Sequence, residues 1–375
     1  MYGLEQLGTD LLAWFDEHQI VLPWRGMGDP YAIWVSEIML QQTQVKTVIP
    51  YFERWMTLFP SLKALAAAPQ DAVMKAWEGL GYYSRARHLL AAAQIVVEHY
   101  EGQIPRHWTA LRRLPGVGDY TAGAILSMAY DQRVPAVDGN ALRVFSRLAL
   151  IREDVSRSLG KRLITSVIQD AMGHISRPGD FNQAVMDLGR DVCVPQRPNC
   201  GVCPVRQHCR AHAAGEERLL PVKPGTRPPR DLVLAAALVE REGRFLLVKR
   251  RSVGIWGGMW SLPTVELPSL LVTDSETCQT AAAREWGLAG WPFQLGAAVV
   301  TLKHQLTHRS LTIPVFEAVL PGMPPAGFEF SWVGPDEWSS VPLPVPFARL
   351  LDRLDAGPLF RQAAHDGCVR PFRLL

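Results

Sequence analysis

The sequence predicts an all-helical domain followed by a smaller α+β domain. Up to residue 220, apolar residues recur at three- and four-residue spacing, which is the period of a helix. Residues 221–230 hold four prolines, one glycine and three basic side chains, which predicts a stiff, extended linker. From 231 to 355, short β-rich runs are bounded by Gly, Pro and polar residues. The 375 residues are enough for each domain to bury its own core.

Individual elements follow from local signals. Asp29 stands before Pro30, which places an N-cap ahead of a proline at the first helical position. Asp138 precedes the helical run GNALRVFSRLAL in the same way. In the second domain, the runs LVLAAALVE, RFLLVKR, AAVVTLKH and LTIPVFEAVL predict strands, and one helix is expected near 276–287. The C-terminal tail, 356–375, carries no motif to which we assign a role.

Composition and charge exclude several classes of protein. Hydrophobic residues make up 48% and charged residues 20%, which is typical of a globular chain rather than a disordered or collagen-like one. No run reaches the roughly 18 apolar residues of a membrane span, and the N-terminus lacks the basic cluster of a signal or transit peptide. We therefore expect a cytoplasmic, bacterial protein without membrane contact. The net charge of +3 is too small to argue for nucleic acid by itself.

Four of the six cysteines fall within seventeen residues, at the spacing C-x6-C-x2-C-x5-C. In a reducing compartment such a cluster indicates a metal site rather than two disulfides. Four thiolates can enclose one tetrahedral metal or one cubane cluster. His208 or His212 would be a spare ligand for zinc, so the spacing alone leaves zinc and a cluster open. The cysteines are Cys193, Cys200, Cys203 and Cys209.

The stretch LPGVG (114–118) stands between two helical runs. Gly116 and Gly118 let the backbone turn sharply and approach a partner closely. The amides at the start of the next helix would then face outward and form an anion site suited to a DNA phosphate. An ordinary helix–helix turn is the simpler alternative.

Two acids stand in different surroundings. Glu37 lies among apolar neighbours in YAIWVSEIML, where partial burial would raise its pKa and favour the protonated form. Asp138 lies at a helix start, where the dipole and free amides favour the ionised form. Such a pair can protonate a leaving group and stabilise a cationic transition state. Taken singly, Glu37 could instead be a core-edge acid paired to an arginine, and Asp138 only an N-cap.

Together, these features resemble the helix-hairpin-helix DNA glycosylases of the endonuclease III superfamily. Within it, the match is closest to the adenine DNA glycosylase (MutY) family, and it covers nearly the whole chain. The motifs that carry the resemblance are LPWR (22–25), SEIMLQQTQVKTVIPYFERW (36–55), GLGYYSRAR (79–87), LPGVGDYTAGAI (114–125), VDGN (137–140), FNQAVMDLG (181–189) and the cysteine loop (193–209).

The resemblance implies an adenine glycosylase that acts as a monomer on duplex DNA, at the nucleoid of a bacterial cytoplasm. Its substrate would be adenine opposite 8-oxoguanine or guanine, and a mispaired base costs less to extrude from the duplex. The four cysteines would bind one [4Fe–4S] cluster, which puts zinc well behind.

The resemblance also implies roles for single residues. Glu37 would protonate the adenine ring and then help to activate water, while Asp138 would stabilise the oxocarbenium-like sugar. Asn140 and Tyr120 would support the site. The expected DNA contacts are Trp24 and Arg25 in the adenine pocket, Gln42, Thr43, Leu80 and Tyr82 near the extruded base and its partner, and Gly116 and Gly118 at the hairpin.

Tyr120 separates two subfamilies. The bifunctional lyases of the superfamily carry a lysine at this position, as a Schiff-base nucleophile. Tyrosine cannot form an imine, nor can its neighbours Asp119 and Thr121. The resemblance therefore implies a monofunctional glycosylase that leaves an abasic site.

The second domain resembles a Nudix (MutT-like) fold with a broken hydrolase signature. Six residues after Gly258 stands Thr264 instead of glutamate, and the later glutamate pair is missing. Without those carboxylates a divalent-metal site is not expected, so the domain should bind rather than cleave. The expected 8-oxoguanine contacts are Thr307 and His308, where the family's Phe-Ser-His loop becomes Leu306-Thr307-His308.

Three other functions compete with this one. A bifunctional, endonuclease III-like pyrimidine glycosylase/lyase is disfavoured by Tyr120 and by the appended second domain. A non-catalytic DNA-damage sensor would need Glu37 or Asp138 to be missing, and both are present. An active nucleotide-pyrophosphate hydrolase is disfavoured by the broken carboxylate signature.

Overall fold

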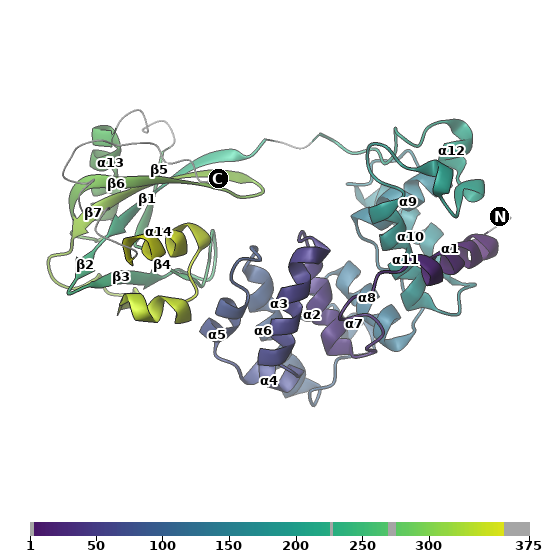
Figure 1. Cartoon of the computed structure of the whole chain (residues 1–375), viewed down its shortest axis with the longest axis horizontal. Coiled ribbons are helices and arrows are strands. Elements are labelled where there is room, and N and C mark those ends of the chain that lie inside the picture. Colours follow the sequence, from purple (N-terminus) through teal and green to yellow (C-terminus); the bar gives the residue numbers. More distant parts are fainter. Residues whose placement is uncertain (1–3, 226–227, 269–274, 356–375) are drawn as a thin grey trace. The chain divides into compact units, whose positions relative to one another are not determined.

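The computed structural model describes residues 4–225, 228–268 and 275–355, so the tail 356–375 lies outside the described residues (Figure 1). The helical domain and the α+β domain expected from the sequence are both present, which confirms the fold class.

Contacts divide the chain into two compact units. Of the described residues, the first holds 4–68 and 85–225, and the second holds 69–84, 228–268 and 275–355. The break after residue 225 falls within the linker expected from the sequence. The segment 69–84 differs from the expectation, because it groups with the second unit rather than with the helical residues that flank it.

The first unit is helical, and short 3-10 turns occur in its cysteine loop. Its helices are α1 (Leu4–His18), α2 (Pro30–Leu40), α3 (Val45–Leu58), α4 (Leu62–Ala67), α6 (Ser84–His99), α7 (Trp108–Leu111), α8 (Asp119–Tyr130), α9 (Gly139–Ala149), α10 (Ser158–Met172), α11 (Pro178–Asp191) and α12 (Arg210–Ala214), with the turns η1 (Cys200–Val202) and η2 (Arg206–His208).

Helix α2 is buried along its length. Every residue from Tyr31 to Met39 is buried, because the helix packs against both α3 and α8. Asp29 caps its start as predicted, accepting a hydrogen bond from the Tyr31 amide at 3.0 Å, and Pro30 occupies the first turn. A helix without a solvent face must keep any polar side chain it carries inside the protein.

A second part of the helical core lies between α1, α9, α10 and α11. Phe15, Phe145 and Phe181 are each about 1% exposed or less within this cluster. Cys193 and Cys209 pack against its edge. The cysteine loop therefore rests on the same core as the helix that Asp138 begins.

A buried amide clamps the segment that leads to Asp138. Asn182 Nδ2 donates to Ser127 Oγ at 2.8 Å and to the Val134 carbonyl at 3.0 Å, and its Oδ1 accepts from the Ala136 amide at 3.1 Å. Asn182 is 2% exposed, so these three bonds satisfy a side chain that water does not reach. They hold residues 134–136 against α8 and α11.

The second unit contains two sheets with helices packed on them. Its elements are α5 (Gln70–Ala76), β1 (Arg230–Leu238), β2 (Glu240–Arg241), β3 (Arg244–Lys249), β4 (Trp260–Ser261), β5 (Thr264–Leu267), α13 (Ser275–Leu288), β6 (Gln294–Gln305), β7 (Arg309–Val319), β8 (Phe330–Val333), η4 (Pro335–Ser340) and α14 (Val345–Asp355).

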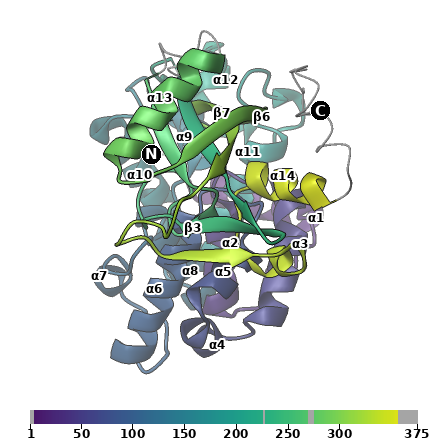
Figure 2. The same cartoon turned by 90° about the vertical axis from the view of Figure 1, so that its left-hand side faces the viewer.

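The larger sheet has the order β5-β1-β7-β6, with β1 and β7 parallel and the other neighbours antiparallel. In the smaller sheet, β3 pairs with β2, β4 and β8. Helix α13, which covers the range expected to be helical, packs against β5 and β6 (Figure 2). Trp286 on α13 and Phe316 on β7 are each 1% exposed in the core of this unit.

The segment 69–84 is fixed to the second unit by polar contacts. The Asp71 carboxylate accepts from Trp260 Nε1 at 3.1 Å and lies 3.2 Å from Lys249 Nζ. Lys75 Nζ donates to the Val341 carbonyl at 3.1 Å. Because these partners are far apart in the sequence, local patterns could not assign the segment to this unit.

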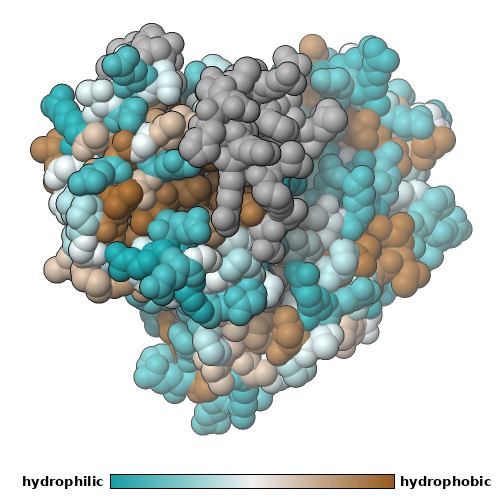
Figure 3. Space-filling view, turned by 60° about the vertical axis from the view of Figure 1, so that its left-hand side comes forward, coloured by the Kyte–Doolittle hydropathy of each residue, from teal (hydrophilic) through white to brown (hydrophobic). Residues whose placement is uncertain are grey.

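Within the described residues, no helix is both long and apolar enough to cross a bilayer. The face drawn in Figure 3 intermixes hydrophilic and hydrophobic side chains.

Replacing Gly123 by alanine should destabilise the helical unit. A Cβ at Gly123 would lie 2.1 Å from the Pro135 carbonyl oxygen, a backbone atom that cannot easily move away. Overpacking of this kind costs about 1–3 kcal/mol. Thermal unfolding followed by circular dichroism should show a lower midpoint for Gly123→Ala.

Gly287→Ala on α13 is the matched control. Its added Cβ meets nothing within 4 Å, and alanine is favoured over glycine in a helix by about 1 kcal/mol. Its midpoint should be equal or higher. An unchanged midpoint for Gly123→Ala would contradict the close packing of α8 on residues 134–136.

Candidate active site

Both predicted acids line one hollow of the helical unit. The hollow has a volume of about 930 Å³ and is bounded by the end of α2, the starts of α8 and α9, and the end of α11. The residues singled out from the sequence that line it are Trp24, Arg25, Glu37, Gln42, Thr43, Tyr120, Asp138 and Asn140.

Glu37 lies on the buried helix α2 and is 4% exposed. Burial raises the pKa of its carboxyl group to about 7. The Tyr120 hydroxyl donates a hydrogen bond to Glu37 Oε2 and opposes this rise, while the charge of Asp138 adds to it. The prediction that burial raises the pKa of Glu37 is confirmed.

Tyr120 belongs to the first turn of α8. Burial raises the pKa of its phenol well above the ordinary value, and the neighbouring Glu37 carboxylate adds to the shift. Tyr120 therefore keeps its proton at neutral pH and acts as the donor to Glu37. This hydrogen bond joins α8 to α2 at the hollow.

Asp138 is the N-cap of α9, as predicted. Its Oδ1 accepts from the Ala141 amide at 2.7 Å, and its Oδ2 accepts from Asn140 Nδ2 at 2.7 Å. Hydrogen bonds from the amides at the helix start lower the pKa of Asp138 and so favour the ionised form, as expected. Burial of the carboxyl group outweighs the amide hydrogen bonds and raises the pKa of Asp138.

Arg143 joins this site to the cysteine loop. Its Nη2 donates to Asn140 Oδ1 at 2.8 Å and to the Gly189 carbonyl at 2.7 Å, and its Nε donates to the Cys193 carbonyl at 2.8 Å. Asn140 in turn holds Asp138. One guanidinium thus connects the N-cap of α9, the end of α11 and the first cysteine.

Arg25 is held at the hollow by Asp187, which sequence reasoning missed. Arg25 Nη2 lies 2.8 Å from Asp187 Oδ2, and Arg190 Nη1 lies 2.6 Å from Asp187 Oδ1. The Asp187 side chain is 3% exposed. The arginine therefore pairs with Asp187, which disfavours a simple Glu37–arginine pair. Partners 162 residues apart leave no local signal, although the motif FNQAVMDLG contains Asp187.

The turn after α2 contains a strained residue, Gln42, and is held by hydrogen bonds from Arg85. Gln42 has a φ of +61°, a conformation that costs a non-glycine residue free energy. The buried Arg85 donates through Nη1 to the Ile38 carbonyl at 2.6 Å and to the Gln41 carbonyl at 2.7 Å, and its Nη2 lies 3.4 Å from Thr43 Oγ1. A cation at the C-terminus of α2 also satisfies carbonyls that the helix leaves free.

Gly116 and Gly118 are not among the residues that line this hollow. Gly116 has a φ of +76°, and a Cβ there would lie 2.8 Å from His88 Cβ. Gly118 is the N-cap of α8 without a side-chain cap, and a Cβ there meets nothing within 4 Å. The Asp119 carboxylate pairs with Arg112 at 2.6 Å. There is therefore open space beside Gly118 at the start of α8, whereas Gly116 is closely packed.

Leu80, Tyr82, Thr307 and His308 lie in the second unit. Leu80 is buried, whereas Tyr82 is 39% exposed and has a φ of +46°. The Tyr82 hydroxyl donates to the Thr307 hydroxyl. Two residues expected to contact DNA, from distant parts of the sequence, are thus adjacent.

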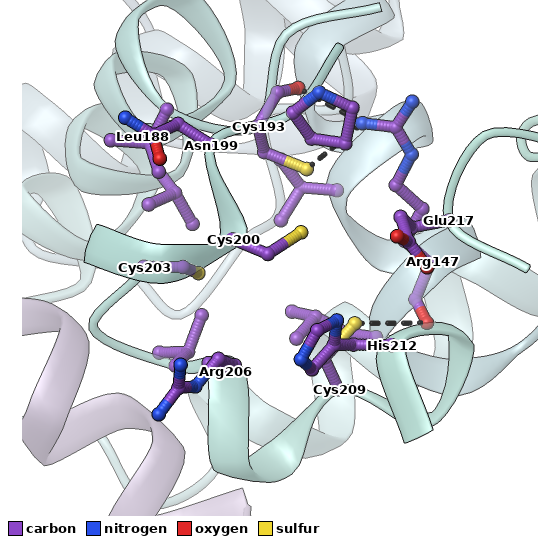
Figure 4. A pocket seen from close by; sticks show the side chains of 15 residues that line it. Arg147, Leu188, Cys193, Asn199, Cys200, Cys203, Arg206, Cys209, His212 and Glu217 are labelled. Atoms are coloured by element: carbon purple, nitrogen blue, oxygen red, sulfur yellow. Dashed lines mark hydrogen bonds between the residues drawn. The ribbon is translucent and has the colours of Figure 1, made fainter. Parts of the chain in front are cut away.

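The four cysteines line a second, smaller hollow, and Figure 4 shows their sulfurs turned toward it. Burial raises the pKa of Cys203 to about 11 and also raises the pKa of Cys200 and of Cys209. Arg147 Nη1 donates to Cys193 Sγ at 3.2 Å. Thiolates in such surroundings need compensating positive charge, so four converging thiols fit a metal or metal cluster.

The two histidines considered as spare zinc ligands lie in different places. His212 borders the cysteine hollow, where one ligand atom each from His212, Cys200 and Glu217 lie within 4.8 Å of one another. His208 Nε2 instead pairs with Asp10 Oδ2 of α1 at 2.8 Å. Of these two histidines, only His212 is available to a metal in the hollow.

Comparison of this sequence with known proteins gives matches to DNA repair enzymes. Residues 35–169 match the model of the HhH-GPD superfamily of base excision DNA repair proteins. The chain is 38% identical over 370 residues to an adenine DNA glycosylase of Rattus norvegicus, covering 84% of this chain and 71% of the relative. The chain belongs to the adenine DNA glycosylase family. Relatives of that name in Homo sapiens and Buchnera aphidicola subsp. Acyrthosiphon pisum are 37% and 34% identical, with 67% and 69% of their lengths covered.

A solved structure resembles the helical part of this family member. A thermostable thymine-DNA glycosylase aligns with a TM-score of 0.52 and 24% identity, over 56% of this chain and 97% of that one. At this identity the likeness supports the fold alone.

Residues 234–353 match the model of the NUDIX domain. Thr264 on β5 stands where the hydrolase signature has a glutamate, and its hydroxyl accepts a hydrogen bond from Arg250 Nη1 at 2.6 Å. A carboxylate ligand for a divalent metal is therefore replaced at this position by a hydroxyl bound to a cation, which disfavours a hydrolase.

Glu37→Gln should remove a pH dependence of folding stability. The folded-state pKa of about 7 exceeds the ordinary value of 4.5, so the folded chain keeps a proton that the unfolded chain releases between these values. The free energy of unfolding of the native chain therefore falls from pH 4.5 to 7, by about 3 kcal/mol. Glutamine is neutral throughout and escapes this loss.

Urea unfolding at a series of pH values tests this prediction. The stability of Glu37→Gln relative to the native chain should increase from pH 4.5 to 7 and then level off. Glu53→Gln, which alters an exposed acid of α3, is the control. A difference between Glu37→Gln and the native chain that does not vary with pH would contradict a buried, proton-holding Glu37.

Proposed function

We propose that this protein is a monofunctional DNA glycosylase that hydrolyses the N-glycosidic bond of adenine mispaired with 8-oxoguanine or guanine in duplex DNA. One observation carries the proposal: Glu37, with a pKa of about 7, shares a hollow with a second carboxyl group, Asp138. The first can donate a proton, and the second can face a developing positive charge. Membership of the family supports adenine as the base.

Glu37 would act as the general acid. A pKa of about 7 keeps a large fraction protonated at neutral pH, where an acid of matched pKa is most effective. Protonation of an adenine ring nitrogen draws the bonding pair of the glycosidic bond onto the base, which leaves as neutral adenine. Asp138 would stabilise the positive charge on the sugar. The ionised Glu37 would then accept a proton from the water that adds to the sugar carbon.

Tyr120 would limit the reaction to base removal. Its hydroxyl is bound to Glu37, and a phenol cannot attack the sugar carbon to form an imine as a lysine amine does. The product would be an abasic site in an unbroken strand.

The surrounding residues would bind and extrude the base. Trp24 and Arg25 would contact adenine in the hollow, and the braced turn with Gln42 and Thr43 would enter the duplex. Outward amides at the hairpin would bind a phosphate. Leu80 and Tyr82 of the second unit would contact the duplex near the lesion. We expect the chain to act as a monomer, at the nucleoid of a bacterial cytoplasm.

We infer that the four cysteines hold one [4Fe–4S] cluster. Their spacing has a single C-x2-C knuckle, whereas structural zinc sites usually pair two. When bound, the cluster would cross-link the end of α11 to the loop and supply redox capacity. Cys193, Cys200, Cys203 and Cys209 would be its ligands.

The turn between β6 and β7 would recognise 8-oxoguanine. Thr307 there offers a hydroxyl beside Tyr82, a residue expected in the duplex, and His308 offers an imidazole. Leu306 replaces the aromatic residue of other members, so this position offers no ring to stack on a base.

The function is tested with a duplex that holds one adenine opposite 8-oxoguanine and a label on the adenine strand. Strand breaks should appear only after hot alkali, because base removal precedes any cut.

Glu37→Gln and Asp138→Asn should retain duplex binding and lose excision by a factor of about 100 or more. Breaks without alkali would identify a lyase. Binding without excision by the native chain would favour a damage sensor.

Thr307→Val should weaken the preference for adenine opposite 8-oxoguanine over adenine opposite guanine. Loss of a neutral hydrogen bond should reduce the ratio of excision rates about fivefold, whereas Thr307→Ser keeps the hydroxyl and should keep the ratio. Thr301→Val, at an exposed position of β6, is the control. An unchanged ratio in Thr307→Val would remove Thr307 from lesion recognition.

A further inference from the structure

We propose that a further hollow beside Asp138 binds the phosphodiester backbone of the substrate strand, with Lys161 as a phosphate ligand. The inference rests on the glycosylase function proposed above. The hollow has a volume of about 620 Å³ and is lined by the first turn of α8, by residues 134–139 and by α10.

Its position follows from the residues that it shares with the active-site hollow. Tyr120, Asp138 and Gly139 line both. If Asp138 faces the sugar of the extruded nucleotide, the phosphates joined to that sugar must leave the active-site hollow along the protein surface. The further hollow begins at Asp138 and reaches Asp119, the first residue after the hairpin. It therefore joins the sugar site to the proposed hairpin phosphate site.

The chemistry of the walls matches a sugar–phosphate chain. Val134, Pro135, Val137 and Leu142 offer apolar surface to deoxyribose, and Trp108, which is 38% exposed, lines the same hollow. A Cβ added at Gly139 meets nothing within 4 Å, so the backbone there is open to close approach.

The charges point to Lys161. Of the described residues that line the hollow, Lys161 alone is a cation, and it is exposed. Asp119 is already paired with Arg112 at 2.6 Å, whereas the Lys161 ammonium has no ion-pair partner in the described part of the chain. Arg162, the next residue of α10, is also exposed but does not line the hollow. A phosphate in the hollow would supply the charge that Lys161 lacks.

The experiment compares Lys161→Ala with Arg162→Ala. The two variants remove the same charge from adjacent positions, so a general electrostatic field would affect both alike. The full chain is titrated with two labelled duplexes, one with a tetrahydrofuran abasic analogue opposite 8-oxoguanine and one fully paired. Neither duplex can be cleaved at a glycosidic bond of mispaired adenine, so the titration reports binding alone.

Lys161→Ala should raise Kd about tenfold near 0.1 M salt, the scale of one charge-assisted hydrogen bond. The factor should be larger on the duplex with the abasic analogue than on the fully paired one, because only an extruded nucleotide carries its phosphates into the hollow beside Asp138. The slope of the logarithm of the binding constant against the logarithm of salt concentration should fall by about one.

The two control variants should behave differently. Arg162→Ala should keep Kd within about twofold of the native chain and leave the salt slope unchanged, and Lys161→Arg should restore most of the affinity.

Two results would overturn the proposal. Equal effects of Lys161→Ala and Arg162→Ala would reduce Lys161 to general surface charge. A slower excision at saturation with unchanged Kd would assign the hollow to departure of the free base instead. If the native chain excised no adenine, the proposed function would fail, while the contrast between Lys161→Ala and Arg162→Ala in DNA binding would still be measured.

Discussion

The buried carboxyl group of Glu37 is the constraint on which the helical unit depends. A carboxyl group that is 4% exposed is costly to ionise, so its proton is retained up to a pH of about 7. That burial requires α2 to be covered along its whole length, which α3 and α8 achieve. It also requires a polar partner inside the protein, and Tyr120 supplies one from the first turn of α8. The packing of three helices and the chemistry of one acid are therefore set by the same contacts.

The second carboxyl group is positioned by a different part of the unit. Asn182 holds residues 134–136 through three hydrogen bonds, and Asp138 follows as the N-cap of α9. Arg143 then ties Asn140 to the carbonyls of Gly189 and Cys193. These hydrogen bonds all come from the buried guanidinium of Arg143. If the cysteine loop moved, Arg143 would lose the Cys193 carbonyl as a partner, and its hold on Asn140, next to Asp138, would weaken. The structure of the cysteine loop and the position of Asp138 therefore depend on each other through the hydrogen bonds of Arg143 and Asn140.

Local chemistry was predictable from the sequence, and long-range pairing was not. The N-caps Asp29 and Asp138 and the raised pKa of Glu37 follow from immediate neighbours, and each is confirmed. The four cysteines are close together in the sequence, so it was also predictable that their thiols would line one hollow. The net rise in the pKa of Asp138 was not predictable, because a helix start reveals the amides that lower the pKa but not the depth of burial that raises it. The Arg25–Asp187 pair joins residues 162 positions apart, so no spacing rule could find it.

The residue at position 120 determines which of two chemistries this hollow can support. A phenol donates a hydrogen bond to Glu37 while remaining neutral, and burial keeps the pKa of the acid at about 7 although this bond lowers it. A lysine ammonium at the same position would place a positive charge beside Glu37. A positive charge within a few ångströms lowers the pKa of a carboxyl group. Glu37 would then ionise and lose its value as a proton donor near neutrality. Within this geometry, a charged lysine at position 120 would disfavour a protonated Glu37, whereas a neutral tyrosine leaves the raised pKa of the acid in place.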